Sequence, residues 1–266
     1  MTDAGADFYS RQALVPIRSM RNCFRPLLAA TLTLLTAACW AQDASHDAVA
    51  IASFSAAPPG PVPKPWRFAT LPNKKPTVFD IAEQDGSHVL RVATDDSYGN
   101  LVHAMRAPGG ALRLDWRWRL DRPLAQADLR QRSGDDAALK LCVSFDYDIG
   151  RLGFGERTRL RLARISTGEA IPGQTLCYVW DRQLPDGTLL DNAFTRRMRF
   201  IVLRSGHDPL SRWMHERRDL QADYLRAFGD EAPEHMPDVI GVTVSADADN
   251  THGASLGYVG DIRLER

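Results

Sequence analysis

The stretch from Val239 to Leu264, VIGVTVSADADNTHGASLGYVGDIRL, decides the fold class. Apolar and polar side chains alternate in its first run, whose apolar face carries Ile240, Val242 and Val244. The same period of two returns in its second run, between Tyr258 and Leu264. Alternation of this kind is typical of half-buried antiparallel strands. We interpret the stretch as two strands that close a β-sandwich around an acidic corner.

The cleanest strand pattern elsewhere in the chain is LRLDWRWRL, from Leu112 to Leu120. Trp116 and Trp118 share one face with three leucines, whereas arginines and an aspartate occupy the other face. Exposed tryptophans can stack on sugar rings, so a sugar platform is one reading of this face. Large apolar side chains at strand period are normally buried, and the pattern therefore favours a core position for both tryptophans.

Further strands are predicted at 77–81, 88–93, 101–105, 139–145, 176–181 and 200–204, with a hairpin turn at Asp85–Gly86. One convincing helix follows Trp213, with Asp219 available as its N-cap and Gly229 as its stop. Strands and helices do not alternate in the manner of a parallel sheet. The sequence thus predicts a mainly β fold: one antiparallel, jelly-roll-like β-sandwich over residues 66–266, with one helix in its C-terminal half. Residues 150–173 are interpreted as a long hairpin or an insertion.

The first 65 residues differ in composition from the rest. Residues 1–41 resemble a secretory signal, with translation starting at Met20, two arginines, a short apolar run and a cleavage point after Ala41. That run is too short for a comfortable membrane span. We therefore expect a periplasmic or secreted protein, or alternatively a protein anchored by a lipid on Cys39. Residues 42–65, rich in proline and alanine, are predicted to be a flexible linker.

The charge balance argues against one class of partner. The chain has 33 basic and 33 acidic residues, so its formal net charge is zero, and no nucleic-acid partner is expected. Once the signal is removed, only Cys142 and Cys177 remain. An oxidising compartment permits a disulfide between them, and two small buried thiols are the alternative.

Six short motifs in order make the chain similar to one bacterial family of secreted proteins, that of domain of unknown function 3047. They are GDD at 134–136, YVW at 178–180, SG at 205–206, W-x-x-E-x-R-D at 213–219, D-Y-x-x-A-F-G at 223–229, and D-A-D-N-T at 247–251 with a closing Y-x-G-D-I at 258–262. The resemblance runs from about Trp66 to the C-terminus. It implies no activity or cofactor, because the family has no established one.

The C-terminal stretch also offers ligands for a cation. Its oxygen-bearing side chains are of the type that Ca²⁺ takes in proteins, and the candidates are Asp247, Asp249, Asn250 and Asp261. A structural Ca²⁺ at this corner is therefore one hypothesis. The alternative is a turn in which these side chains accept hydrogen bonds from backbone amides.

Two hypotheses of function remain from the sequence. The first is a non-catalytic module that binds a glycan or another envelope component through aromatic side chains, with Tyr178, Trp180 and Trp213 as the candidates. The second is a glycan-cleaving hydrolase or lyase, which needs two carboxyl groups in one cleft. For that chemistry the candidates are Asp135 or Asp136 together with Glu216.

Overall fold

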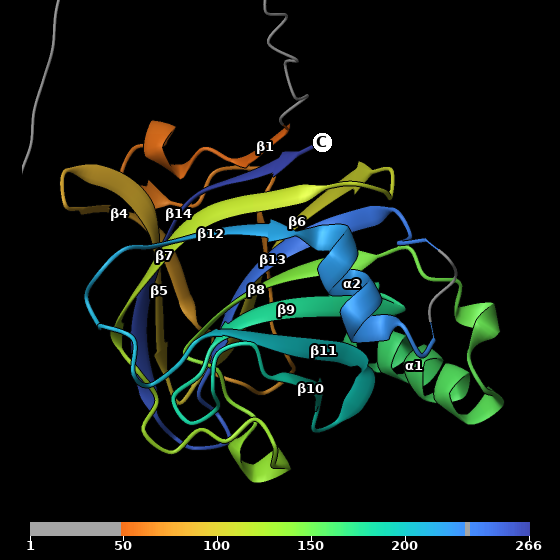
Figure 1. The fold of residues 1–266 in the computed structure, drawn as a ribbon. Helices are drawn as coiled ribbons and strands as arrows, with labels where there is room; N and C mark the ends of the chain where they lie inside the picture. Colours follow the sequence, from red (N-terminus) through yellow and green to blue (C-terminus); the bar gives the residue numbers. More distant parts are fainter. Residues whose placement is uncertain (1–48, 232–234) are drawn as a thin grey trace, which may run out of the picture. The chain divides into compact units, whose positions relative to one another are not determined.

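A computed structural model describes residues 49–231 and 235–266, which belong to a compact unit of residues 44–266. Two sheets of seven strands lie face to face (Figure 1). The first sheet consists of β12 (Met214–Asp219), β7 (Arg113–Arg122), β14 (Ala254–Glu265), β5 (Ser87–Asp95), β4 (Val78–Gln84) and β2 (Gly60–Pro61), with β1 (Val49–Ala52) beside β14. The second sheet consists of β10 (Leu189–Asn192), β11 (Thr195–Arg204), β9 (Gln174–Trp180), β8 (Leu139–Phe145), β13 (Val239–Asp247), β6 (Tyr98–Ala107) and β3 (Arg67–Ala69). The predicted β-sandwich is confirmed.

Almost all neighbouring strands in both sheets are antiparallel. The exception is β11, which runs parallel to β9. The short edge strand β10 lies between these two strands in the sequence and forms an antiparallel hairpin with β11. The predicted turn between β4 and β5 also forms. Asp85 and Gly86 have φ values of 51° and 73°, the left-handed conformation that a tight hairpin requires.

The two strands of the C-terminal stretch occupy central positions, one in each sheet. In the first sheet, β14 lies between β5 and β7, and in the second, β13 lies between β6 and β8. The core between the sheets is built from alternate side chains of such strands, and Trp116 and Trp118 are 1% and 0% exposed within it. The double-tryptophan face is therefore core, as its pattern indicated, and is no sugar platform.

The N-terminal boundary of the domain differs from the prediction. The linker interpretation of residues 42–65 is wrong from residue 49 onward, since β1 pairs with β14 and Phe54 is buried in the core. The proline-rich composition after residue 57 made this short apolar segment hard to recognise, because its backbone hydrogen bonds are made with the C-terminal end of β14, beyond the part that pairs with β5. The signal region 1–41, with Met20 and Cys39, lies outside the described residues.

The two α-helices of the described residues lie at the same end of the sandwich (Figure 1). The predicted helix is α2 (Leu220–Phe228), and its N-cap Asp219 accepts a hydrogen bond from the backbone N–H of Ala222. The second helix, α1 (Phe154–Thr167), corrects the hairpin interpretation of residues 150–173. Neither helix in the described ranges is long and apolar enough to cross a bilayer.

A second apolar cluster lies on the outer side of the second sheet. It contains Leu129, Leu184 and Phe200 together with Cys142 and Cys177, which face each other on β8 and β9 and form a disulfide. This cluster explains why every residue of β8 and β9 is buried, whereas β7 is buried only at alternate positions.

Removing the disulfide should lower stability. Its cysteines are separated by 35 residues, and constraining a loop of this length is worth about 4 kcal/mol of unfolding free energy. For a domain of this size, that loss corresponds to a fall of roughly 8–16 °C in Tm for the Cys142→Ala/Cys177→Ala double variant, measured by circular dichroism. Dithiothreitol should lower the Tm of the wild type and leave that of the variant unchanged. Equal melting temperatures for the two proteins would contradict a structural role for the disulfide.

Candidate functional site

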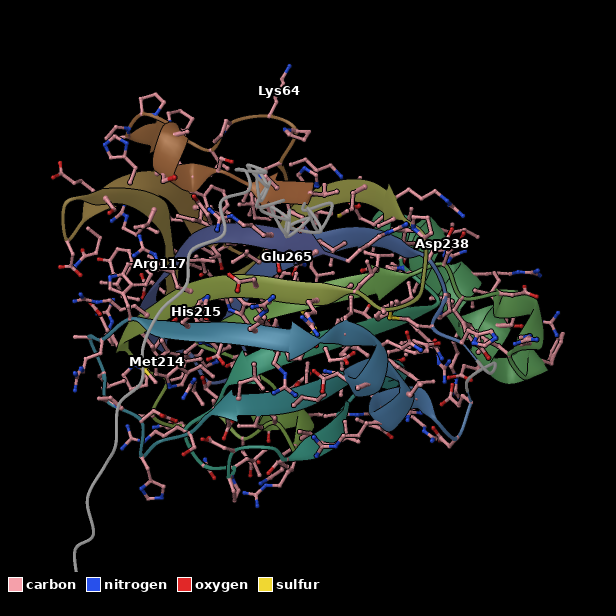
Figure 2. The ribbon with its side chains drawn as sticks, turned by 45° about the horizontal axis from the view of Figure 1, so that its top comes forward. Lys64, Arg117, Met214, His215, Asp238 and Glu265 are labelled. Carbon is pink, nitrogen blue, oxygen red and sulfur yellow. A yellow bond between two sulfur atoms is a disulfide. The ribbon has the colours of Figure 1, made fainter. Side chains whose placement is uncertain are left out.

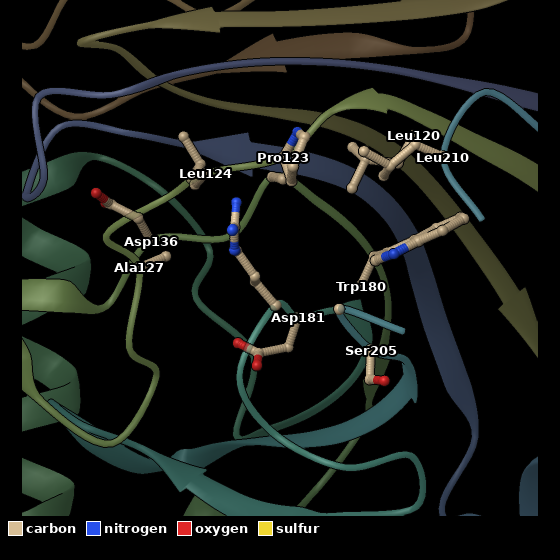
Figure 3. Close-up of a pocket in the computed structure, with 12 residues that line it drawn as sticks. Leu120, Pro123, Leu124, Ala127, Asp136, Trp180, Asp181, Ser205 and Leu210 are labelled. Atoms are coloured by element: carbon tan, nitrogen blue, oxygen red, sulfur yellow. The ribbon is translucent and has the colours of Figure 1, made fainter. Parts of the chain in front are cut away.

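A pocket of about 150 Å³ opens at the end of the sandwich where β7, β9 and β11 finish. Its lining is amphipathic. The apolar part consists of Leu120, Pro123, Leu124, Ala127, Ala138, Trp180 and Leu210, and the polar side chains are those of Asp136, Asp181, Arg182 and Ser205. Trp180, Asp181 and Ser205 lie on one side of the hollow, across from Leu120, Pro123 and Leu124 (Figure 3). A concave apolar site with a few convergent polar groups is the usual form of a small-ligand site.

Asp181 is the most unusual polar group of this pocket. It follows directly on Trp180, the last residue of β9, and its Oδ1 accepts hydrogen bonds from the backbone N–H groups of Gln183 (2.6 Å) and Leu184 (2.5 Å). Among the described residues no side chain or backbone donor is placed on its Oδ2. Burial raises the pKa of the Asp181 carboxyl, and the two backbone hydrogen bonds oppose that rise. One oxygen is therefore fixed by the protein while the other remains available to a ligand.

The opposite end of the pocket is fixed by Asp136. Its two carboxylate oxygens accept hydrogen bonds from the backbone N–H groups of Asn250 and Thr251, the Thr251 hydroxyl and the Asn250 side chain, at 2.7–3.2 Å. Asp136 thus ties the loop after β7 to the turn between β13 and β14. Because both of its oxygens accept hydrogen bonds from the protein, this carboxylate stabilises the loop and the turn.

A buried ion pair holds the same loop from the outer side of the second sheet. The Lys140 ammonium donates to Asp247 Oδ2 at 2.8 Å, and the other oxygen of Asp247 accepts from the backbone N–H of Ala137 at 2.7 Å. Both side chains are less than a tenth exposed. Burial alone would lower the pKa of Lys140, but the Asp247 carboxylate beside it raises the pKa overall. The pair positions the segment 136–138, which supplies two of the residues that line the pocket.

Ser205 and Gly206 complete the rim, and the glycine is required there by close backbone approach. A Cβ at Gly206 would lie 2.3 Å from the carbonyl oxygen of Arg182, so no side chain fits at this position. The approach brings the Ser205 hydroxyl and the Arg182 side chain to the same pocket.

The three predicted ligand-binding aromatic residues have different positions. Trp180 is 3% exposed and lines the pocket with an edge, and the rest of its ring packs on Trp118 in the core. Tyr178 is fully buried between the sheets and donates to Asp223 at 2.9 Å, so its interpretation as a ligand contact was wrong. Trp213 stacks on Arg117 on the outer face of the first sheet, away from the pocket lining. Arg117, His215 and Glu265 lie along that charged face (Figure 2).

The predicted acid/base residues are occupied by other contacts. Glu216 is buried and accepts hydrogen bonds from Trp118 Nε1 at 2.9 Å and from Arg204 Nε at 2.7 Å. Asp135 accepts from the side chain of Asn192 at 2.6 Å, and burial raises its pKa. Only Asp136 of the three lines the pocket.

The four predicted calcium ligands are not gathered at one point. Asp261 accepts hydrogen bonds from the backbone and side chain of Ser55, and it lies seven residues beyond the start of β14, about 23 Å from the turn that carries the others. Asp249 pairs with Lys74 at 2.6 Å, and Asp247 with Lys140. Within the described ranges no group of three or more His, Cys, Asp or Glu residues is arranged to hold a metal ion.

Removing divalent cations should therefore leave this corner intact. The charges of Asp247 and Asp249 are already balanced by lysines, and Asp136 is saturated by backbone and side-chain donors. We expect melting temperatures in excess EDTA and in millimolar Ca²⁺ to agree within about 1 °C, since a ligand stabilises only when it binds the folded state. A rise of several degrees in Ca²⁺ would show that a cation does bind here.

The family model described as "Protein of unknown function (DUF3047)" matches residues 64–263. The chain belongs to the DUF3047 family. Three of the six motifs that carry the resemblance contribute to the pocket of this DUF3047 domain: GDD through Asp136, YVW through Trp180, and SG through Ser205 and Gly206. The D-A-D-N-T motif supplies the turn that Asp136 binds.

Several solved structures are similar in fold. TmCBM61, solved in complex with beta-1,4-galactotriose, shows 14% identity over 76% of this chain and 89% of its own, with a TM-score of 0.32. The Emp47p carbohydrate recognition domain shows 14% identity over 84% and 98%, with a TM-score of 0.40. Endoglucanase 3 of Trichoderma harzianum, from family GH12, shows 9% identity over 83% of this chain and 97% of its own, with a TM-score of 0.38. Similarities this low transfer no ligand or activity to the DUF3047 domain. The sequence matches none of the curated proteins compared with it.

Proposed function

We propose that this DUF3047 domain binds a glycan, without cleaving it, in the pocket at the end of the sandwich. The observation that carries the proposal is the pairing of an apolar wall, including Trp180, with the buried carboxyl of Asp181, whose Oδ2 has no donor in the described part of the chain. A sugar ring combines apolar C–H faces with hydroxyl donors and acceptors, so it matches a lining of this kind.

The polar groups around Asp181 support recognition of sugar hydroxyls. The Arg182 side chain lies in the same pocket and offers donors beside the acceptor Oδ2 of Asp181, while the Ser205 hydroxyl next to them already accepts from the backbone N–H of His207. The volume of about 150 Å³ is below the usual range for a small-ligand site, so we propose that the pocket takes no more than one terminal sugar unit.

Binding is favoured over cleavage because most of the candidate carboxyl groups already accept hydrogen bonds from the protein. Glycoside hydrolysis by the common mechanisms needs two carboxyls flanking the scissile bond. In the pocket, Asp136 has both oxygens engaged by the turn at 250–251, and Glu216, paired with Arg204, is not among the residues that line the hollow. Asp181 is left as the one lining carboxyl with an available oxygen among the described residues.

A glycan array probed with residues 44–266, followed by calorimetric titration of the strongest hit, tests the proposal. The key variant is Asp181→Asn, because an amide oxygen keeps the two backbone hydrogen bonds and removes the charge. We expect its Kd to rise at least about tenfold, the usual loss for a hydrogen bond to a charged group. Glu83→Gln, an exposed acid on β4, is the matched control and should leave Kd unchanged.

The outcomes separate the parts of the proposal. Absence of any hit on the array, or equal affinity of Asp181→Asn and the wild type, would contradict binding at this pocket. New reducing ends released from the bound oligosaccharide would contradict the non-catalytic assignment and favour the hydrolase or lyase alternative.

We also propose that the domain works in the periplasm or outside the cell. The Cys142–Cys177 disulfide supports this placement, since such bonds persist in oxidising compartments. N-terminal sequencing of the protein from cells that express it provides the test. A start at Gln42 supports secretion, and a blocked, lipid-modified Cys39 supports the anchored alternative. A chain that still begins at Met1 or Met20 would contradict both.

A further inference from the structure

Helix α1 carries an apolar strip that faces solvent. Phe154, Leu162 and Ile165 are 82%, 59% and 78% exposed, which is unusual for large apolar side chains. At about 100° per residue they fall within an arc of roughly 80° on one side of the helix. The opposite side is fixed to the domain by Leu160, which packs with Tyr147 and Leu152. The strip is therefore held outward by the fold.

Arginines flank this strip on both sides. Arg159 and Arg161 are exposed next to it, and residues 149–167 contain five arginines and a single acid, Glu156. That acid is already engaged by the buried Arg197 at 2.7 Å. Although the whole chain has a formal net charge of zero, this helix is a strongly basic surface.

We propose that α1 docks the domain onto the surface of an anionic phospholipid bilayer. A helix with an apolar strip between basic residues lies in the plane of the interface, with its apolar side chains among the acyl chains and its cations at the head groups. Anionic head groups attract arginines close to the surface. A second copy of this chain is a poor occupant, because two such faces would bring arginines against arginines.

Vesicle co-sedimentation of residues 44–266 tests this docking. The probes are vesicles of phosphatidylcholine alone and of phosphatidylcholine with 30% phosphatidylglycerol. We expect at least about tenfold stronger partitioning to the anionic vesicles, reduced by 0.5 M NaCl. Two variants separate the contributions: Phe154→Ser/Ile165→Ser removes the apolar anchors, and Arg159→Glu/Arg161→Glu reverses the flanking charge. Each should lower partitioning at least about fivefold.

Matched controls lie elsewhere on the same domain. Phe194→Ser removes an apolar side chain that is 56% exposed in the turn between β10 and β11, and Arg212→Glu reverses an exposed charge outside α1. Both should partition like the wild type. Because the substituted side chains of α1 are exposed, all variants should retain the wild-type circular dichroism spectrum and Tm. Equal partitioning of the α1 variants and the controls would overturn the proposal, as would a concentration-dependent dimer that the α1 variants abolish.

Discussion

Lys140→Met should destabilise the domain by about 3–5 kcal/mol, because it leaves the Asp247 carboxylate buried without its cation. Both side chains of this pair are less than a tenth exposed, so solvent cannot replace the lost partner. Guanidinium chloride unfolding followed by circular dichroism measures the loss. Since the pKa of Lys140 in the folded protein lies above its ordinary value of 10.5, the contribution of its charge is present at neutral pH and is lost as the pH rises through the raised value.

A second variant distinguishes the loss of the ion pair from a general packing effect. Lys140→Met/Asp247→Asn removes both charges and keeps an oxygen for the backbone N–H of Ala137, so it should be more stable than Lys140→Met alone. Lys75→Met breaks the exposed pair with Asp95 and should leave the unfolding midpoint unchanged. If Lys140→Met were as stable as the wild type, the Lys140–Asp247 pair would not hold the loop.

Trp118→Ala should cost about 3–5 kcal/mol of unfolding free energy, the usual range for deleting a buried aromatic ring. The ring packs between Trp116 and Trp180, with centroid distances of 5.6 and 5.7 Å, and its Nε1 donates to Glu216. Equilibrium unfolding in guanidinium chloride, followed by far-ultraviolet circular dichroism, measures this loss.

The conservative variant Trp118→Phe separates ring packing from the hydrogen bond. It retains an aromatic ring and leaves Glu216 with Arg204, so its loss should be smaller, at about 1–2 kcal/mol. A loss below about 1 kcal/mol for Trp118→Ala would contradict the core position of this face, since surface substitutions have effects of that size.

The strands could be predicted wherever one face is buried and the other is exposed to solvent. In β7 the leucines and tryptophans alternate with charged residues, and the burial of those side chains follows the same alternation. The helix α2 could be predicted for a similar reason, because Leu220, Tyr224 and Phe228 recur at helical spacing behind a recognisable N-cap.

Two segments could not be read in this way. In α1 only Leu160 is buried, and the other large apolar side chains face solvent between arginines, so the pattern that marks a core-facing helix is missing. The strand β1 is only four residues long, and it forms because its hydrogen bonds are made with β14, a partner more than 200 positions away in the sequence. Long-range pairing of this kind leaves little local trace.

The candidate site was predicted only in part. Trp180 and Asp136 were identified as chemistry-bearing residues, and they line the pocket. Asp181 was missed because its significance depends on burial and on an oxygen that no local donor reaches. Ser205 and Gly206 were visible as a motif, but the close approach to Arg182 that explains the glycine depends on the fold. The separation of Asp261 from Asp247 likewise follows from strand length, which the residue types alone do not express.

The central claim is that the pocket beside Trp180 and Asp181 is where this domain meets its ligand. An NMR titration of ¹⁵N-labelled domain with the oligosaccharide found on the array tests it most directly. We predict that the largest shift changes occur at the amides of Asp181, Arg182 and Ser205, and that Asp181→Asn removes them. Changes confined to α1 or to the outer face of the first sheet around Trp213, with the pocket amides unmoved, would contradict the claim.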